Sequence, residues 1–539
     1  MRIAIAQIDA CTGAFRYNLH IALDMAMEAA DEGADLIVFP EYALCGAVNE
    51  GLLWSTPFLQ AARRSVTEFA GKCPLPAVIG SLCPGAEEGD QARSAAYFCN
   101  DEGEAVLLDP DDEELPIVEV GGKRIAICLG FELEYDAPSQ TTDVVVELAS
   151  DPYAGPGSCP TEPGELAGAI ERATSGQVWV VHCNLVGGQD ERIFPGGSYC
   201  LSPAGEVVAG GQLFKQHFLV TDELTEGAGH DPALVEPAPE DADRVLWDAL
   251  KLALADYVTK NRFSDVVVGL SGGIDSALVA TLAVDALGAE HVHGVMMPGP
   301  FSSSGSVEDA RELGSNLGIA LQEIPIDAPF AAFKDVLADA CGGAVEGIAL
   351  ENIQARVRMC YLMALSNTHG WMVLNTGNKS ESAVGFSTLY GDTAGAFAPF
   401  GDVYKTQMYA LAEWRNGDGV LIPQAIIDKA PSAELYEGAL DQDRLPPYEL
   451  LDAIVSRHVE GDRGLGDLML EGYDGDMVEK VLGQVSGAEF KRRQEPVAPG
   501  VSGVSFADRG WPITNRFEER RPRSPMEMLR EQQQQQQQR

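Results

Sequence analysis

The chain has 539 residues, 45% of them hydrophobic, and its 82 acidic side chains against 37 lysines and arginines give a formal net charge of −45. This length is too great for one hydrophobic core and predicts two large domains. No apolar run reaches the roughly 18 residues of a membrane-spanning helix, and so acidic a chain would repel a polyanion, which excludes general nucleic-acid binding.

The N-terminus and the cysteines indicate the cellular compartment of the protein. The first residues, MRIAIAQIDAC, are typical of a β-strand and lack the long apolar stretch of a signal peptide. The eleven cysteines include no CxxC pair, and thiols scattered in this way are typical of small buried side chains in a reducing compartment. We therefore expect a cytoplasmic protein.

Residues 1–222 alternate predicted strands and helices. Ile3 and Ile5 share one face of a first strand, a helix is expected over 18–32, and a second strand covers Leu36–Phe39. Further β-type runs cover 77–79, 125–127, 144–146 and 178–181. This βαβ rhythm predicts an α/β sandwich and not an all-β fold.

The rest of the chain divides into three parts. Residues 223–242 are acidic and rich in proline, alanine and glycine, which is typical of a linker. A second α/β domain is expected over 243–515. Residues 516–539 end in a run of glutamines and have little to bury, so they are predicted to be a disordered tail.

The strongest local signal is the run Val-Val-Val-Gly-Leu-Ser-Gly-Gly-Ile-Asp-Ser at 266–276. A buried strand leads into a glycine loop, and a helix with apolar residues at i, i+4 spacing follows until Gly288. Glycines let the backbone approach phosphate oxygens, while the free N–H groups of the helix N-terminus and its dipole bind negative charge. The run therefore predicts an anion site, although not a Walker A loop, because GxxxxGK[ST] is absent.

The pattern SGGxDS at 271–276 resembles the pyrophosphatase loop of N-type ATP pyrophosphatases, a group that includes NAD, GMP, asparagine and argininosuccinate synthetases. Four later segments narrow the resemblance to NAD synthetases of the long, two-domain type, and the match as a whole covers almost all of 245–515. They are Glu351–Arg356; Asn375–Glu381 with Leu389–Asp392; Asp402–Gln407; and Pro431–Leu435 with Leu445–Tyr448. The resemblance implies an adenine-nucleotide α-hydrolase-like, Rossmann-like parallel α/β domain.

The resemblance also implies roles for single residues. Asp275 and Glu381 would hold Mg²⁺, which binds one or two carboxylates together with substrate phosphates. Lys405 would neutralise charge that builds up on pyrophosphate. The ATP contacts would be Gly269, Leu270, Ser271, Gly272, Gly273, Ile274, Asp275, Ser276, Thr376, Lys405 and Ser432, and the deamido-NAD⁺ contacts would be Asn352, Arg356, Glu381 and Lys491. Taken singly, Glu381 could instead cap a helix and Lys405 could be a solvated surface lysine.

The reaction implied by the resemblance has two steps. The nicotinate carboxylate of deamido-NAD⁺ attacks the α-phosphorus of ATP, which releases pyrophosphate and leaves an acyl adenylate. Ammonia then attacks the activated carbonyl to give NAD⁺ and AMP. Positioning and charge stabilisation would supply most of the catalysis.

The first domain resembles the nitrilase-like glutaminase half of the long NAD synthetases, which implies an αββα sandwich. Such a site needs a cysteine nucleophile, a glutamate base and a lysine that stabilises the oxyanion. Glu41 and Cys128, each expected at a strand end, match the first two. The segments Asn184–Glu191 and Gly196–Ser198 also match the family pattern.

The lysine of this site is missing. The family places it in a Lys-x-x-Leu-Pro segment, but here Asp112 stands in its position, only 16 residues before Cys128. No lysine occurs between Lys72 and Lys123. Lys123 precedes Cys128 by five residues, an odd number, so on a strand the two side chains would face opposite sides.

Two further departures concern the same site: the family's Cys-Glu-Asp reads Cys128-Leu-Gly here, and a second lysine is missing from Ser150–Ser158. In addition, the acidic run Asp109–Glu114 would disfavour a thiolate and an oxyanion. We therefore hypothesise that the glutaminase is inactive or weakened and that the synthetase uses free ammonia or ammonia from a partner. The competing interpretation is that Glu41 and Cys128 work with a cation from elsewhere, such as an arginine or a neighbouring subunit.

Three alternatives for the whole chain stay open. They are another adenylating amidotransferase with the same loop, an amidase or nitrilase with a regulatory ATP domain, and a non-catalytic scaffold. The retention of Asp275, Thr376, Glu381 and Lys405 together argues against the scaffold. From the resemblance we also expect a homo-oligomer, with a dimer of synthetase domains and an octamer as the larger assembly.

Overall fold

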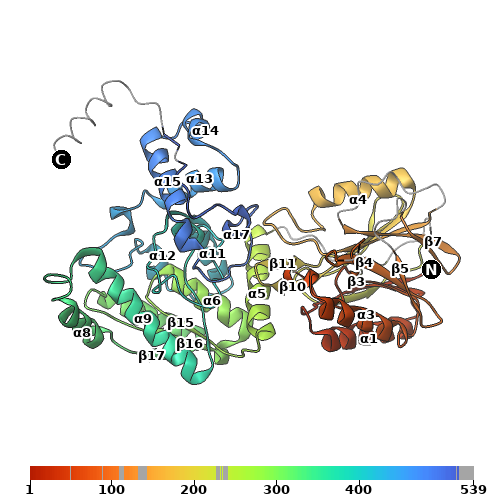
Figure 1. The fold of residues 1–539 in the computed structure, drawn as a ribbon, viewed down its shortest axis with the longest axis horizontal. Coiled ribbons are helices and arrows are strands. Elements are labelled where there is room, and N and C mark those ends of the chain that lie inside the picture. The colour runs from red at the N-terminus through yellow and green to blue at the C-terminus, as the bar shows by residue number, and fades with distance from the viewer. Residues whose placement is uncertain are drawn as a thin grey trace. The chain divides into compact units, whose positions relative to one another are not determined.

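The computed structural model describes residues 1–48, 50–87, 89–108, 115–130, 142–225, 231, 234, 241–517 and 519–520 (Figure 1). The acidic run at 109–114 with Asp112, most of the predicted linker and most of the predicted tail lie outside these residues. The chain forms two compact units, residues 1–262 with 499–501, and residues 263–498 with 502–539.

The first unit contains two six-stranded sheets, with strand orders β14-β1-β2-β3-β4-β5 and β13-β12-β9-β8-β7-β6. Strands β1, β2 and β3 run parallel, as do β7, β8 and β9. Helices α1 and α3 cover the first sheet and α4 covers the second, so the layers follow the predicted αββα order (Figure 1). The strands are β1 (Ile3–Gln7), β2 (Leu36–Val38), β3 (Ala77–Cys83), β4 (Arg93–Cys99), β5 (Ala105–Leu108), β6 (Ile117–Val120), β7 (Lys123–Leu129), β8 (Val144–Ala149), β9 (Trp179–Asn184), β10 (Val186–Gln189), β11 (Arg192–Pro195), β12 (Tyr199–Leu201), β13 (Val207–Gly210) and β14 (His217–Val220). The helices are α1 (Phe15–Asp31), α2 (Glu50–Leu53), α3 (Thr56–Ala70), α4 (Pro163–Gly176) and α5 (Ala242–Lys260).

Alternation of side chains along β1 builds two cores at once. Ile3 and Ile5 lie in the core between the sheets, whereas Ala4 and Ala6 pack beneath α1 and α3. Successive side chains of a strand point to opposite faces, and each face of this strand is covered by an apolar core. Consecutive residues of the strand are therefore apolar, with alternate residues in alternate cores. The predicted strand is confirmed, and the predicted helix over 18–32 begins three residues earlier, at Phe15.

Helix α5 packs on the β10–β11 hairpin of the first unit. A Cβ atom at Gly188 would lie 3.0 Å from Cα of Ala253, so the hairpin backbone lies directly against the helix. At the end of α5 the amine of Lys260 lies 2.6 Å from Asp9 and 3.0 Å from Asp256. The predicted second domain, 243–515, would begin with this helix, which here belongs to the first unit. The predicted domain boundaries stay a prediction.

The second unit is built on a four-stranded parallel sheet of order β17-β16-β15-β18. Val267, Val295 and Val373 from three of its strands share a core with Val357 and Leu362 of the long helix α9. A separate core lies among α13, α14 and α15. The predicted Rossmann-like parallel domain is confirmed. Its strands are β15 (Val266–Gly269), β16 (Val292–Met296), β17 (Ala320–Glu323) and β18 (Met372–Val373). Its helices are α6 (Ile274–Leu287), η3 (Ala289–His291), α7 (Ser304–Leu317), α8 (Asp327–Leu337), α9 (Gly347–His369), α10 (Lys379–Val384), α11 (Lys405–Asn416), α12 (Gln424–Asp428), η4 (Asp441–Asp443), α13 (Tyr448–Val459), α14 (Leu465–Leu470), α15 (Gly475–Gly487), α16 (Glu489–Arg492) and α17 (Phe506–Arg509).

Within the described ranges, every helix is too short or too polar to cross a bilayer.

Candidate functional site

The glycine loop joins β15 to the N-terminus of α6, as the sequence predicts. Gly272 has φ +78°, and a Cβ atom there would lie 2.1 Å from the carbonyl oxygen of Ser306. Only glycine therefore fits without moving the backbone. The Ser276 hydroxyl accepts a hydrogen bond from the amide of Ser271 at 3.2 Å, and the Ser271 hydroxyl accepts one from the amide of Gly273 at 3.2 Å. The loop is thus held compact at the start of a 14-residue helix.

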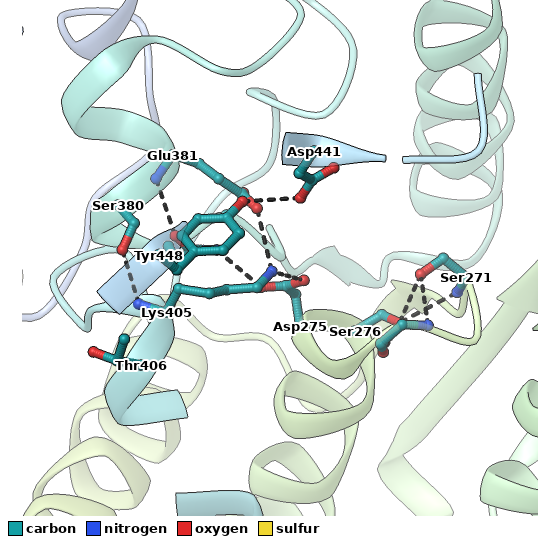
Figure 2. A network of polar contacts seen from close by, with 12 residues as sticks. Ser271, Asp275, Ser276, Ser380, Glu381, Lys405, Thr406, Asp441 and Tyr448 are labelled. Atoms are coloured by element: carbon teal, nitrogen blue, oxygen red, sulfur yellow. Dashed lines mark hydrogen bonds and ion pairs between the residues drawn. The ribbon is translucent and has the colours of Figure 1, made fainter. Parts of the chain in front are cut away.

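Three charged groups from distant parts of the chain meet beside this loop (Figure 2). The amine of Lys405 lies 2.6 Å and 2.8 Å from the two carboxylate oxygens of Asp275, and 3.4 Å from Oε1 of Glu381. Asp275 is in the first turn of α6, Glu381 in α10, and Lys405 is the first residue of α11. Lys405 is 2% exposed, so the interpretation of a solvated surface lysine is wrong.

Burial and charge work against each other in this cluster. Burial raises the pKa of Glu381 to about 8, with Lys405 opposing the shift and Asp275 adding to it. Burial acts to lower the pKa of Lys405, but the Asp275 and Glu381 carboxylates outweigh it and raise that pKa. The lysine is therefore a permanent cation. One lysine thus faces two carboxyl groups, and the raised pKa of Glu381 favours the neutral form of that carboxyl near neutral pH.

Asp441 and Tyr448 complete the cluster, and the sequence analysis gave neither a role. The Tyr448 hydroxyl donates to Oδ2 of Asp441 at 2.9 Å, and its ring lies 5.4 Å from the Lys405 amine (Figure 2). Burial raises the pKa of Asp441, while the bond from Tyr448 lowers it. Tyr448 could have been found from its motif, Leu445–Tyr448. Asp441 carried no signal beyond its place between two motifs.

Asn378 fixes the start of α10 and thereby Glu381. Its side-chain oxygen accepts a hydrogen bond from the Glu381 amide at 3.0 Å, as an N-cap does. Its side-chain amide donates to Asp275 at 2.9 Å. One short polar side chain therefore aligns both predicted metal ligands, which gives a structural reason for an asparagine at this place in the segment Asn375–Glu381.

The other residues predicted to contact ATP or deamido-NAD⁺ lie outside the Lys405 cluster. Thr376 lies in the irregular segment before α10, and the Ser432 hydroxyl donates to the carbonyl of Ala439. Three residues predicted to contact deamido-NAD⁺ converge instead on the segment 385–389. Asn352 accepts from Thr388, Arg356 donates to the Leu389 carbonyl, and Lys491 donates to the carbonyls of Gly385 and Ser387.

In the first unit, Glu41 follows β2 as predicted. Its carboxylate accepts a hydrogen bond from the Ser150 hydroxyl, beyond the end of β8. Burial raises the pKa of Glu41, and the bond from Ser150 lowers it. A Cβ atom at Gly80 would lie 2.5 Å from Cα of Glu41, so a glycine in β3 gives the base its room.

Cys128 lies within β7 and not after the strand, because the strand extends to Leu129. Its side chain belongs to the cluster under α4 with Leu166 and Val180, and its thiol donates to the carbonyl of Val146 at 3.6 Å. Ile125 and Ile127 point to the opposite face, into the core between the sheets. The amine of Lys123 pairs with Asp143 at 2.9 Å.

A buried ion pair lies in the same row of the sheet as Cys128, and the sequence analysis missed it. The register places Cys128 opposite Glu147 and Glu147 opposite His182. Nδ1 of His182 lies 3.1 Å from Glu147, and Arg172 of α4 lies 4.0 Å from the same carboxylate. Burial lowers the pKa of His182, but Glu147 outweighs it and the net pKa is raised. Glu147 is the one charged residue in the strand VVVELA, which is the signal that could have revealed it.

Family models match both halves of the chain. A carbon-nitrogen hydrolase family matches residues 2–106 and an NAD synthase family matches residues 246–495. The chain is 35% identical to the glutamine-dependent NAD⁺ synthetase of Thermotoga maritima, over 96% of this chain and 99% of that protein. It is also 35% identical to the same enzyme of Rhodobacter capsulatus, again over 96% and 99%.

Solved structures agree. The glutamine-dependent NAD⁺ synthetase of Acinetobacter baumannii in complex with ADP has a TM-score of 0.71 at 31% identity and covers 95% of this chain and 98% of its own. That of Cytophaga hutchinsonii, at 18% identity, has the same fold with a TM-score of 0.81 and covers 96% and 98%. From the nearly complete coverage at 35% identity, together with the phosphate loop and its carboxylate–lysine cluster, the chain belongs to the glutamine-dependent NAD⁺ synthetase family, and it is an enzyme of the ligase class.

Proposed function

We propose that the second unit amidates deamido-NAD⁺ to NAD⁺ through an acyl adenylate, with release of AMP and pyrophosphate. The observation that carries the proposal is the cluster of Asp275, Glu381 and Lys405 at the N-terminus of α6. Attack at the α-phosphorus builds negative charge on the leaving pyrophosphate. A buried lysine beside a phosphate loop stabilises that charge without having to reorganise.

The carboxylates of the cluster fit Mg²⁺. Asp275 and Glu381 both face the amine of Lys405, so their oxygens point to one place. No group of three or more histidine, cysteine or carboxylate side chains in the described part of the chain could hold a metal by itself. Two carboxylates with phosphate oxygens are the set that Mg²⁺ prefers. Bound there, Mg²⁺ would supply neutralisation of the phosphate charge, and Asn378 would hold both ligands in place.

The patch around 385–389 is the proposed place for the nicotinate dinucleotide. Asn352, Arg356 and Lys491 approach this segment from α9 and α16, and their polar heads are bound to Thr388 or to backbone carbonyls. Burial lowers the pKa of Lys491, with Asp392 opposing the shift. A substrate carboxylate or phosphate would replace the carbonyl acceptors of Arg356 and Lys491 and add the attraction between opposite charges.

For the nitrogen source we propose ammonia, free or delivered by a partner, with the first unit weakened as a glutaminase. The reasons are the missing lysine, the carbon-nitrogen hydrolase match that ends before Cys128, and the apolar cluster around that thiol. Arg172, which lies on the same face of the sheet, is a candidate for the competing role of substitute cation.

We also propose a cellular compartment and an oligomeric state for the protein. The eleven cysteines are scattered along the sequence with no CxxC pair, which supports a reducing, cytoplasmic setting. Ile348 and Met363 of α9 are 65% and 42% exposed, which supports a homo-oligomer built through this helix.

The test is NAD⁺ formation by the full chain from deamido-NAD⁺ and Mg-ATP, with ammonium and with glutamine in parallel. Activity with ammonium, little activity with glutamine, and no effect of Cys128→Ala on the ammonium reaction are the expected results. Glutamine-driven activity that Cys128→Ala abolishes would refute the weakened glutaminase. If neither nitrogen source gives NAD⁺, the synthetase proposal itself fails.

A further inference from the structure

Residues 429–441 form a strap that reaches from the phosphate loop to the carboxylate cluster. At its start the amine of Lys429 donates to the Gly272 carbonyl at 3.1 Å and to the Ser306 hydroxyl at 3.1 Å, and pairs with Asp309. At its end, Asp441 lies beside Lys405. The amide of Asp441 donates to the carbonyl of Pro431 at 3.1 Å, so the two ends of the strap lie together.

Glu434 fastens the middle of the strap to helix α7. Its carboxylate accepts hydrogen bonds from the Ser303 amide at 3.2 Å, the Ser303 hydroxyl at 2.9 Å and the Ser306 hydroxyl at 2.7 Å. Ser303 is the N-cap of this 14-residue helix. Glu434 itself has φ +48°, a left-handed conformation that costs energy outside glycine. Three bonds to one carboxylate compensate for that conformation.

The position of Glu434 is one that would otherwise suit a phosphate. Helices α6 and α7 follow the neighbouring parallel strands β15 and β16, so both begin at the carboxyl edge of the sheet. An N-terminus of this kind attracts anions through its free amides and its dipole. The Glu434 carboxylate already fills that role at α7, which leaves the N-terminus of α6 for a ligand.

We propose that Lys429 and Glu434 are positioning residues for ATP, an inference that rests on the proposed function. They hold the strap closed against the phosphate loop, and Glu434 reserves the α7 N-terminus so that the triphosphate binds at α6 alone. Ser432, the predicted ATP contact within the strap, is held by Glu434 as well. Its hydroxyl accepts a hydrogen bond from the backbone amide of Glu434 at 3.1 Å.

The variants are Glu434→Ala, which removes all three bonds, and Glu434→Gln, which keeps an acceptor without the charge. Glu437→Ala is the matched control, since Glu437 is an exposed acid on the same strap. Three experiments are done on the full chain: calorimetry gives the Kd of Mg-ATP, hydrogen exchange is followed at the strap amides without nucleotide, and steady-state kinetics give kcat and KM for NAD⁺ formation with ammonium. If Glu434→Ala does not fold, Lys429→Met tests the other fastening.

We expect Glu434→Ala to raise the Kd and KM for ATP by about tenfold or more, because it removes charge-assisted hydrogen bonds, with kcat within about threefold of the wild type. The strap amides should exchange faster, Glu434→Gln should lie between, and Glu437→Ala should match the wild type. An unchanged Kd, or an equal loss in Glu437→Ala, overturns the proposal. If the wild type binds Mg-ATP but makes no NAD⁺, the proposed function fails, while the Kd and exchange data still decide on the strap.

Discussion

The amine of Lys405 lies 2.6 Å from Oδ2 and 2.8 Å from Oδ1 of Asp275, although 130 residues separate the two in sequence. The contact joins the first residue of α11 to the first turn of α6. The backbone amide of Lys405 is also held, by the Ser380 hydroxyl at 2.8 Å. Both the main chain and the charged end of this lysine are therefore fixed, which suits the role proposed for it at a leaving pyrophosphate.

Replacement of Lys405 by methionine tests that role. The change removes the cation but keeps most of the volume of the side chain. We expect the rate of NAD⁺ formation with ammonium to fall by about 100-fold or more, the usual loss when a buried charge-stabilising group is removed. Steady-state kinetics give the result. Lys334→Met, at an exposed lysine of α8, should leave the rate unchanged, and a fall of less than tenfold in Lys405→Met would assign the lysine a structural role.

Gly272→Ala should close the phosphate loop to ATP. The new methyl group would lie 2.1 Å from the Ser306 carbonyl, at a φ of +78° that alanine disfavours. We expect the Kd of Mg-ATP to rise beyond the measurable range in calorimetry. Gly305→Ala is the control from the neighbouring helix α7, since its methyl group would have no neighbour closer than 4.0 Å. Tight ATP binding by Gly272→Ala would mean that the loop backbone does not hold the phosphates.

Lys260→Met should destabilise the first unit. The amine lies between Asp9 and Asp256 and also donates to the Gly188 carbonyl at 2.9 Å. Its removal leaves two carboxylates facing each other, so we expect a loss of about 2–4 kcal/mol, somewhat below that of a fully buried pair. Urea unfolding followed by far-UV circular dichroism measures it. Lys251→Met in the same helix, whose pair with Asp248 is at 3.5 Å, should cost much less.

Asp9 should make stability depend on pH. Burial raises its pKa from 3.8 to about 6, with Asp256 adding to the shift and Lys260 opposing it. A carboxyl with a raised folded pKa contributes stability that is full below pH 3.8 and is lost as pH rises through 6. Urea unfolding at several pH values should therefore give Asp9→Asn a flatter profile than the wild type over this window. Parallel profiles for the two proteins would contradict the assignment.

Much of the architecture could be predicted because local patterns carry it. The strand at Ile3 and Ile5, the strand leading to Glu41 and the strand–loop–helix at 266–276 were all visible in short runs of residues. Strand boundaries were less secure, and Cys128 was placed after β7 when it lies within it. Strand length depends on the partners of a strand, here β6 and β8, which no single segment reveals.

The sequence by itself determined the two-domain α/β organisation, the phosphate loop and the family, since each of these follows from short motifs and their order. Only the tertiary structure decided that Asp441 and Tyr448 complete the Lys405 cluster, that Glu147 lies opposite Cys128 and pairs with His182, and that Glu434 fills the N-terminus of α7. The reason is physical: these pairs are charged or polar groups whose energies depend on burial and on partners from other elements. Neither burial nor partnership is encoded in any one stretch of chain.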